Sequence, residues 1–210
     1  NDFVICCGYK GYLIKEYFNN YFLHNSDVSI NFKNNNIEFL NKVKEPWKVT
    51  LVDTGEKTET AGRLLKVKNY IENDAFMLTY GDGVGNINIR SLLEHHKRNN
   101  KQVTLTAVQP PGRFGDLELN QNQVIAFKEK PTGEGSWING GFFVIEPNAI
   151  NLISGYLESW EADILPKIAN ANNLAAYRHD GFWLPMDTLR DKKRLQKLWE
   201  NGNAPWKVWE

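Results

Sequence analysis

The chain has 210 residues, of which 41% are hydrophobic and 24% are charged, and its 25 basic and 25 acidic side chains give a formal net charge of zero. This length allows one large domain, or one domain with a small appendage, whose core buries most of its apolar surface. The charge balance argues against broad electrostatic binding of nucleic acid. The absence of an apolar run of roughly 20 residues argues against a membrane span.

Strand and helix patterns alternate through the first half of the chain. An Asn-rich excursion with two weak strands, 28–32 and 37–40, interrupts them. The expected strands are 3–7, 47–53, 75–79 and 103–108, and the expected helices are 12–22, one that begins near Ala61 with Thr60 as its cap, and 89–98. This order predicts a Rossmann-like, mostly parallel sheet with helices on both faces.

The second half mixes short strands with short helices. The expected elements are a hairpin of 115–119 and 124–128, a strand within 137–145, helices near 149–152 and 161–168, strands at 174–179 and 182–184, and a last helix from Thr188 to about Glu200. No Pro/Gly/Ser-rich linker divides the chain. We therefore expect a single α/β domain over residues 1–210 with a small C-terminal α+β elaboration.

The two cysteines, Cys6 and Cys7, are adjacent on the first expected strand. Neighbouring side chains on a strand point to opposite faces, and a disulfide between adjacent residues would be strained. We interpret both as reduced structural thiols. Because the first residues also lack the pattern of a signal peptide, the sequence predicts a cytoplasmic protein.

Gly81-Asp82-Gly83 ends an apolar run that is typical of a strand buried on both faces. Open α/β sheets bind ligands at the carboxyl ends of their strands, and a carboxylate there can hold Mg²⁺ on a phosphate. Asp187 follows the expected strand 182–184 and could complete the same metal site. The alternatives are a solvated turn for Asp82 and, for Asp187, a carboxylate favoured by a helix N-terminus.

Further candidate ligand contacts lie in polar or glycine-containing segments. Gly62 stands in the first turn of a helix, where backbone N–H groups can bind phosphate or a base edge, although this segment taken alone is better explained as a plain N-cap. Lys130 could meet a phosphate and Glu129 sugar hydroxyls, or both could belong to a solvated charge run. Asn139-Gly140 could permit close approach of a ligand to a strand.

Other kinds of site lack their sequence signatures. The four histidines show no zinc-ligand spacing. The chain contains no Gly-x-Ser-x-Gly nucleophile elbow, no Walker Gly-Lys-Ser/Thr and no Gly-x-Gly-x-x-Gly after a strand. These absences leave a metal-assisted phosphate site as the chemistry that the patterns favour.

Seven motifs in order resemble the sugar-1-phosphate nucleotidyltransferases, and among them the members that use CTP and glucose 1-phosphate. They are Thr-Leu-Val-Asp-Thr-Gly (50–55), Thr-Ala-Gly-Arg-Leu (60–64), Tyr-Gly-Asp-Gly-Val (80–84), Pro-Pro-Gly-Arg-Phe-Gly (110–115), Glu-Lys-Pro (129–131), Ile-Asn-Gly-Gly-Phe-Phe-Val (138–144) and Phe-Trp-Leu-Pro-Met-Asp-Thr-Leu-Arg-Asp (182–191). Each motif is weak alone, but seven in order are specific. The resemblance covers essentially the whole chain.

The resemblance implies the nucleotide-diphospho-sugar transferase fold, with a nucleotide-binding half (1–109) and a sugar-binding and C-terminal half (110–210). It implies nucleotidyl transfer from CTP to glucose 1-phosphate with Mg²⁺, giving CDP-glucose and pyrophosphate. The site residues that it implies are Asp82 and Asp187 for the metal, Gly62, Arg63 and Gly81 for the nucleotide, and Gly115, Glu129, Lys130, Asn139 and Gly140 for the sugar phosphate.

The sequence departs from the family at its start. The family's first strand, its Gly-rich triphosphate loop and a catalytic lysine are not among these 210 residues, so no catalytic residue is assigned. We therefore expect an N-terminally truncated version of the fold that is weak or inactive alone. Its unpaired strand edges predict a homo-oligomer. The alternative is a non-catalytic module that binds sugar phosphate or serves in assembly.

Overall fold

The structure is a computed structural model that describes residues 2–41, 45–71, 73–110, 116–121, 123–128 and 136–209. The chain divides into two compact units, each built from two separate stretches of sequence. Unit 1 comprises residues 1–72 and 150–166, and unit 2 comprises residues 73–149 and 167–210. The single-domain prediction is not tested by this division.

Unit 1 is organised around two parallel strands, β1 and β4, which pair from Asp2 with Lys48 to Cys7 with Asp53. Gly8 to Lys10 lead from β1 into the first helix. The described elements of this unit are β1 (Asp2–Cys7), α1 (Gly11–Asn19), α2 (Tyr21–Asn25), β2 (Asp27–Asn31), β3 (Asn36–Leu40), β4 (Lys48–Asp53), α3 (Thr60–Val67), a 3₁₀ turn (Lys68–Tyr70) and a π-helical turn (Trp160–Ile164). The expected 28–32 and 37–40 strands are confirmed as the antiparallel β2–β3 hairpin.

Helix α3 forms the core of unit 1 together with the second stretch of its sequence. The buried side chains of α3 are Ala61, Leu64 and Val67, and Trp160 of the π-helical turn is fully buried. Thr60 does not cap this helix as expected, because the N-cap is Glu59. The Thr60 hydroxyl instead accepts a hydrogen bond from the Trp160 N–H at 2.8 Å and donates one to Glu161 at 2.7 Å. Thr60 therefore ties the two stretches of unit 1 together.

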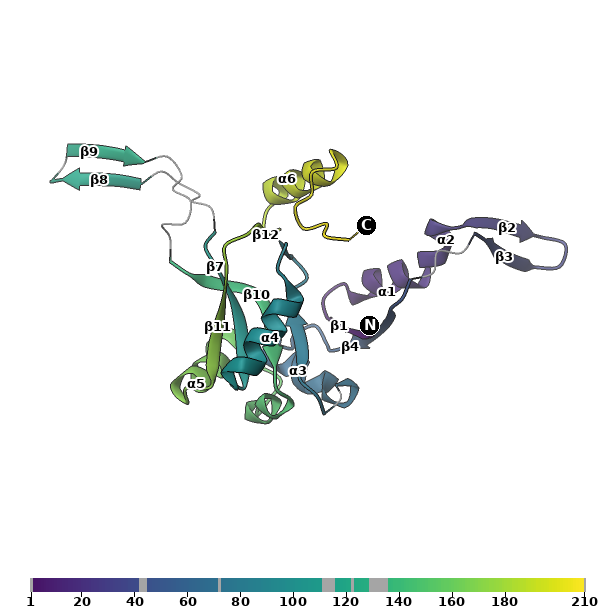
Figure 1. Cartoon of the computed structure of the whole chain (residues 1–210). Coiled ribbons are helices and arrows are strands. Elements are labelled where there is room, and N and C mark those ends of the chain that lie inside the picture. The colour runs from purple at the N-terminus through teal and green to yellow at the C-terminus, as the bar shows by residue number, and fades with distance from the viewer. Residues whose placement is uncertain are drawn as a thin grey trace. The chain divides into compact units, whose positions relative to one another are not determined.

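Unit 2 contains a four-stranded sheet in the order β11-β7-β10-β5, with α4 against β7, β10 and β11 (Figure 1). Strand β11 runs parallel to β7, whereas β10 runs antiparallel to both of its neighbours. The described strands are β5 (Phe76–Thr79), β6 (Gly83–Gly85), β7 (Val103–Val108), β8 (Asp116–Asn120), β9 (Gln123–Lys128), β10 (Ile138–Ile145), β11 (Leu174–His179) and β12 (Trp183–Pro185). The helices are α4 (Ile89–Asn99), α5 (Leu165–Asn170), which crosses the boundary between units, and α6 (Leu189–Glu200); a 3₁₀ helix, Pro147–Leu152, also crosses it.

Capping side chains define where the two longest helices of unit 2 begin. Asn88 caps α4 by accepting a hydrogen bond from the Ser91 N–H at 3.0 Å. Thr188 caps α6, as the sequence predicts, by accepting from the Asp191 N–H at 3.2 Å. These bonds satisfy backbone donors that have no partner within the helix.

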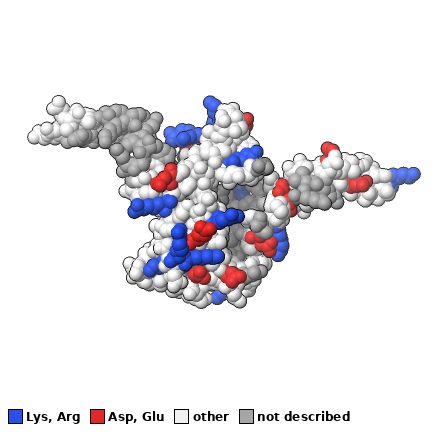
Figure 2. Space-filling model, in the orientation of Figure 1, with Lys and Arg blue, Asp and Glu red and all other residues white. Residues whose placement is uncertain are grey.

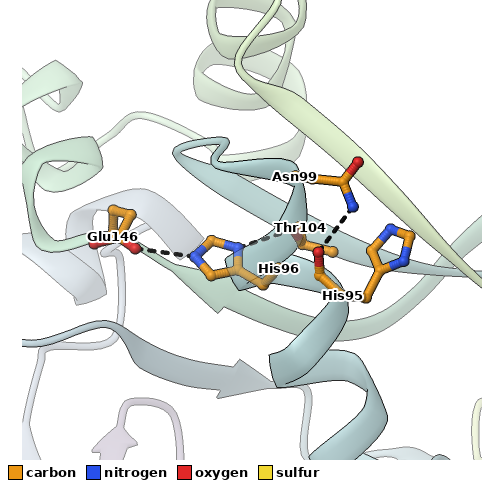
Figure 3. Close-up of polar contacts among 5 residues, drawn as sticks. All are labelled: His95, His96, Asn99, Thr104 and Glu146. Atoms are coloured by element: carbon orange, nitrogen blue, oxygen red, sulfur yellow. Dashed lines mark hydrogen bonds and ion pairs between the residues drawn. The ribbon is translucent and has the colours of Figure 1, made fainter.

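A buried histidine joins α4 to the sheet (Figure 3). His96, with 2% of its side chain exposed, lies with Nδ1 2.9 Å from the Thr104 hydroxyl on β7. Its Nε2 lies 3.1 Å from the Glu146 carboxylate, which directly follows β10. Both ring nitrogens therefore have partners, as burial of a polar ring requires.

Basic and acidic side chains are intermingled on the face shown in Figure 2, which agrees with the balanced charge of the sequence. Among the described residues, none of the helices is long and apolar enough to cross a membrane. The α/β fold class is confirmed, and each unit contains one parallel strand pair. The described strands are not mostly parallel as expected, because β10 runs antiparallel to β5 and β7, and β2–β3, β6–β12 and β8–β9 are antiparallel pairs.

Candidate metal and sugar-phosphate site

Pairing of two short strands brings the predicted metal carboxylates to one place in unit 2. Strand β6 begins directly after Asp82, and β12 ends two residues before Asp187. Beyond the Gly83–Pro185 pair, the Met186 N–H donates to the Asp82 carbonyl at 2.9 Å and extends the pairing by one residue. Both aspartates are exposed to solvent. The strand ends thus place two carboxylate residues where a cation and a phosphate have access.

The Asn139-Gly140-Gly141 segment lies beside the end of β5. The Tyr80 N–H donates to the Gly141 carbonyl at 3.1 Å, and the Gly141 N–H donates to Asn139 Oδ1 at 2.9 Å. Gly141 has φ +76°, and a Cβ there would lie 2.7 Å from the Tyr80 ring. Glycine is therefore required by both conformation and space. Asn139 Nδ2 also donates to the Tyr80 hydroxyl at 3.3 Å, which orients the amide.

The indole of Trp183 connects these two parts of the site. Its N–H donates to the Gly140 carbonyl at 2.8 Å. A Cβ on Gly83 would lie 3.8 Å from the indole nitrogen, and one on Gly85 would lie 3.4 Å from indole Cδ1. The two glycines recur with the two-residue period of a strand, so they leave one face of β6 open to the ring. Trp183 thus bridges β6 and β10.

The structure consequently groups five of the predicted residues around the ends of β5, β6, β10 and β12: Gly81, Asp82, Asn139, Gly140 and Asp187. A Cβ on Gly81 would meet no described atom within 4 Å, which leaves open space at that position. Sequence reasoning missed β6 and Trp183. The sequence signal that could have indicated this strand is the two-residue spacing of the glycines in Gly83-Val84-Gly85. This spacing leaves one strand face free for the ring of Trp183 on the paired strand.

Two predicted nucleotide contacts lie in unit 1, where each has an intramolecular role. Gly62 is buried, and a Cβ there would lie 2.7 Å from the Tyr156 Cα and still closer to its carbonyl. The Gly62 N–H points to the Glu158 carbonyl at 3.4 Å. The glycine therefore lets the 154–158 backbone pass directly over α3.

Arg63 holds the loop that follows β4. Its Nη1 donates to the Thr54 hydroxyl at 2.6 Å and to the Gly55 carbonyl at 3.1 Å. The fully buried Thr54 hydroxyl in turn donates to the Cys7 carbonyl at 2.9 Å. Lys66 adds a bond to the Thr54 carbonyl at 2.8 Å. The guanidinium thus links the carboxyl ends of β1 and β4. Its several N–H donors in one plane suit this role better than the single ammonium group of a lysine would.

Both cysteines have free thiols. Burial is the largest influence on each, and it raises the pKa of the Cys6 and Cys7 thiols above the ordinary 9.0. The nearby Arg63 guanidinium only partly opposes the rise in the pKa of Cys6. Such thiols are protonated at neutral pH and react slowly, which agrees with the predicted structural role.

The remaining predicted site residues, Gly115, Glu129 and Lys130, lie outside the described residues. Within the part that is described, no group of three or more His, Cys, Asp or Glu side chains could hold a metal ion. A pair of exposed carboxylates is nevertheless the protein donor set that Mg²⁺ uses when phosphates and water complete its coordination. Asp82 and Asp187 fit that arrangement.

Comparison with known proteins identifies the class: residues 7–197 match the family model for nucleotidyl transferases, and the chain belongs to that family. Within it, the chain is a sugar-1-phosphate nucleotidyltransferase homologue, as the seven motifs predict. Over all 210 residues the chain is 54% identical to glucose-1-phosphate cytidylyltransferase of Salmonella typhimurium strain LT2, of which it covers 82%. It is 37% identical, again over 82% of that protein, to a probable glucose-1-phosphate cytidylyltransferase of Bacillus subtilis strain 168.

The structural comparison supports the same fold at low sequence identity. The crystal structure of HddC from Yersinia pseudotuberculosis matches with a TM-score of 0.62 and 17% identity, covering 94% of this chain and 78% of that one. Together with the family match, this likeness confirms the predicted nucleotide-diphospho-sugar transferase fold.

Proposed function

We propose that the protein serves nucleotidyl transfer from CTP to glucose 1-phosphate, with CDP-glucose and pyrophosphate as products. The observation that supports it most strongly is 54% identity along the entire chain to a protein with that named activity. In this reaction a phosphate oxygen of the sugar phosphate bonds to the α-phosphorus of CTP. The bond from that phosphorus to the bridging oxygen breaks, and pyrophosphate leaves with the electron pair.

The residues grouped in unit 2 would bind and orient the reactants. Asp82 and Asp187 would hold Mg²⁺, which when bound neutralises charge on the phosphates. Asn139 keeps one amide N–H and one carbonyl lone pair beyond its bonds to Tyr80 and Gly141, and these could meet sugar hydroxyls. Gly140, Gly115, Glu129 and Lys130 would complete the sugar-phosphate contacts. Gly81, with open space beside it, would lie against the nucleotide.

Gly62 and Arg63 are proposed nucleotide contacts. The Arg63 donors not bonded to the 54–56 loop could meet a base or phosphate, whereas contact with Gly62 would need the 154–158 backbone to move away from α3. The buried network that holds the guanidinium would fix its position before a ligand arrives.

Turnover by the 210-residue polypeptide alone is expected to be weak, because the triphosphate loop and lysine that the resemblance implies are not among its residues. A coupled assay of pyrophosphate release with CTP, glucose 1-phosphate and Mg²⁺ tests this expectation. Appreciable release would contradict it.

Binding tests the site independently of turnover. Calorimetry should show Mg²⁺-dependent binding of CDP-glucose that Asp82→Asn and Asp187→Asn each weaken at least tenfold, because each change removes a charged ligand. Asp180→Asn, at an exposed aspartate of the same unit, is the matched control and should bind as the unmodified chain does. Equal binding by all four proteins would contradict the assignment.

A non-catalytic module that binds sugar phosphate is the second candidate. The internal engagement of Gly62 and Arg63 favours it, since the predicted nucleotide contacts already have structural partners. Binding of glucose 1-phosphate without any binding of CTP would support this candidate over the enzyme.

We also propose a homo-oligomer in the cytoplasm. Strand β5 pairs with β10 alone among the described strands, and β1 pairs with β4 alone, so each leaves an edge that another strand could join. The β2–β3 hairpin adds exposed apolar side chains, with Phe32 85% and Ile37 56% exposed. Two reduced thiols support the cytoplasmic location.

A further inference from the structure

Trp183 occupies the junction between the two halves of the site in unit 2. The β6–β12 pair carries Asp82 and Asp187, whereas β10 carries Asn139 and Gly140. These two groups belong to different sheets of the described fold. A contact that fixes one relative to the other would therefore set how a metal-bound phosphate meets the sugar.

The indole makes such a contact on two sides. Its N–H holds the Gly140 carbonyl at 2.8 Å, and its ring covers the Gly83 and Gly85 face of β6. Gly83 itself lies close to this hydrogen bond, because a Cβ there would be 3.6 Å from the Gly140 oxygen and 3.8 Å from the indole nitrogen. Gly83, which lies beside this bond, directly follows Asp82 in the chain. Gly140, which accepts the bond, directly follows Asn139.

The surrounding packing gives the indole a fixed orientation. Trp183 packs against the apolar cluster of Ile87, Leu92 and Val144, together with Phe142. Its backbone pairs with Gly85 in the β6–β12 ladder. A ring held in this way can transmit the position of one strand to the other, since packed side chains resist small displacements.

We propose that Trp183 is a positioning residue that couples the carboxylates Asp82 and Asp187 to the Asn139-Gly140 segment. The inference rests on the proposed function of this site. Each half can bind its own ligand without the indole N–H, because β6 and β12 stay paired through their backbones and Asn139 stays oriented by Tyr80 and Gly141. The indole N–H matters when both ligands are bound at once.

Calorimetry on the full 210-residue chain can measure this coupling with Mn²⁺ and glucose 1-phosphate as probes. The quantity is the ratio of the Kd of glucose 1-phosphate without Mn²⁺ to its Kd with saturating Mn²⁺. Trp183→Phe keeps a ring over β6 but removes the donor. We expect the ratio to fall about fivefold, the equivalent of one neutral hydrogen bond, while each ligand alone binds within about twofold of its original affinity.

Trp209→Phe is the matched control, since Trp209 is 57% exposed in the C-terminal tail, and it should leave the ratio unchanged. Trp183→Leu is a second variant that also removes the donor and should repeat the loss. An unchanged ratio in a folded Trp183 variant would overturn the inference, as would a ratio of one in the unmodified protein.

Loss of folding in both Trp183 variants would likewise overturn it, because Trp183 would then act in folding alone. Failure of the proposed function looks different. In that case the unmodified chain and the Trp209 control would bind neither Mn²⁺ nor glucose 1-phosphate, and both proposals would fall together.

Discussion

Gly62 belongs to one of the seven sequence motifs and is also required for packing. In the sequence it stands at a helix start, where a plain structural role is the favoured explanation and a phosphate or base contact is the alternative. In the structure the backbone of Tyr156 crosses its Cα so closely that any side chain would collide. The structural role is therefore observed, and the nucleotide contact stays a proposal.

Gly62→Ala should destabilise the protein by roughly 1–3 kcal/mol, because the added methyl group meets backbone that cannot rotate away. The measurement is the urea midpoint of unfolding. Gly155→Ala is the matched control in the same unit, since a Cβ there meets no described atom within 4 Å. Equal midpoints for the two variants would show that the 154–158 backbone can move aside.

The Cys6 and Cys7 thiols make stability depend on pH in the alkaline range. Burial raises the pKa of Cys6 and of Cys7 above 9.0 in the folded chain, so the folded state holds these protons more tightly than the unfolded state. Their contribution to stability is complete below pH 9.0 and is lost as the pH rises through the folded values.

We expect the free energy of unfolding to fall as the pH rises above 9, and to fall less steeply in a Cys6→Ala/Cys7→Ala variant. Denaturant titrations at half-unit pH intervals measure both slopes. The comparison removes the titration of tyrosines and lysines, which both proteins share. Parallel slopes would contradict the prediction.

At the scale of elements, α4 is fixed to its sheet by a polar contact inside an apolar interface. Thr104 is fully buried on β7, and its hydroxyl has His96 as partner. A buried polar group that loses its partner costs more than the bond contributed, whereas replacement of both groups by apolar ones can be nearly neutral. The pair should therefore behave non-additively.

His96→Leu is expected to lower the free energy of unfolding by about 2–3 kcal/mol, because it leaves the Thr104 hydroxyl buried without its partner. The double variant His96→Leu/Thr104→Val should recover part of that loss. Glu94→Gln, at an exposed position of the same helix, should change stability little. A double-mutant cycle by thermal or urea unfolding measures the coupling. Additive effects would contradict it.

Helices and strands with a clear periodicity of apolar residues could be predicted from the sequence. Strands that form only because a distant strand pairs with them could not. The 103–108 strand and the helix from Ile89 were predicted almost to the residue, because an apolar run and apolar residues at helical spacing are local signals. Strand β6 was missed because two of its three residues are glycines, which disfavour strands by propensity. Its pairing with Trp183–Pro185 outweighs that propensity.

The same distinction holds for the site. Asp82 and Asp187 could be placed at strand ends from local patterns, but their proximity depends on the β6–β12 register. Trp183 belongs to the seventh motif, but the sequence assigns it no role, since that role comes from the Gly140 carbonyl on another strand. Long-range pairing of this kind leaves little trace in a single sequence.

At the scale of the whole molecule, exposed apolar residues on the β2–β3 hairpin support the proposed oligomer. Phe32→Glu/Ile37→Glu should shift the chain toward monomer in light scattering at several concentrations, because charge on this surface opposes burial. Leu157→Glu is the matched control at another exposed apolar side chain, 76% exposed, and should leave the mass unchanged. A monomeric unmodified chain at every concentration would contradict the oligomer itself.

Because unit 1 is built from two separate stretches of sequence, its two parts leave the ribosome at different times. Helix α3 is synthesised about a hundred residues before Trp160. The backbone N–H of Trp160 donates to the Thr60 hydroxyl, and its ring is fully buried in the core. Throughout that interval the nascent α3 lacks the cover for its apolar face. The first part of the chain therefore waits, incompletely folded, while most of unit 2 is translated, and a chaperone that recognises apolar helices would meet it during that delay.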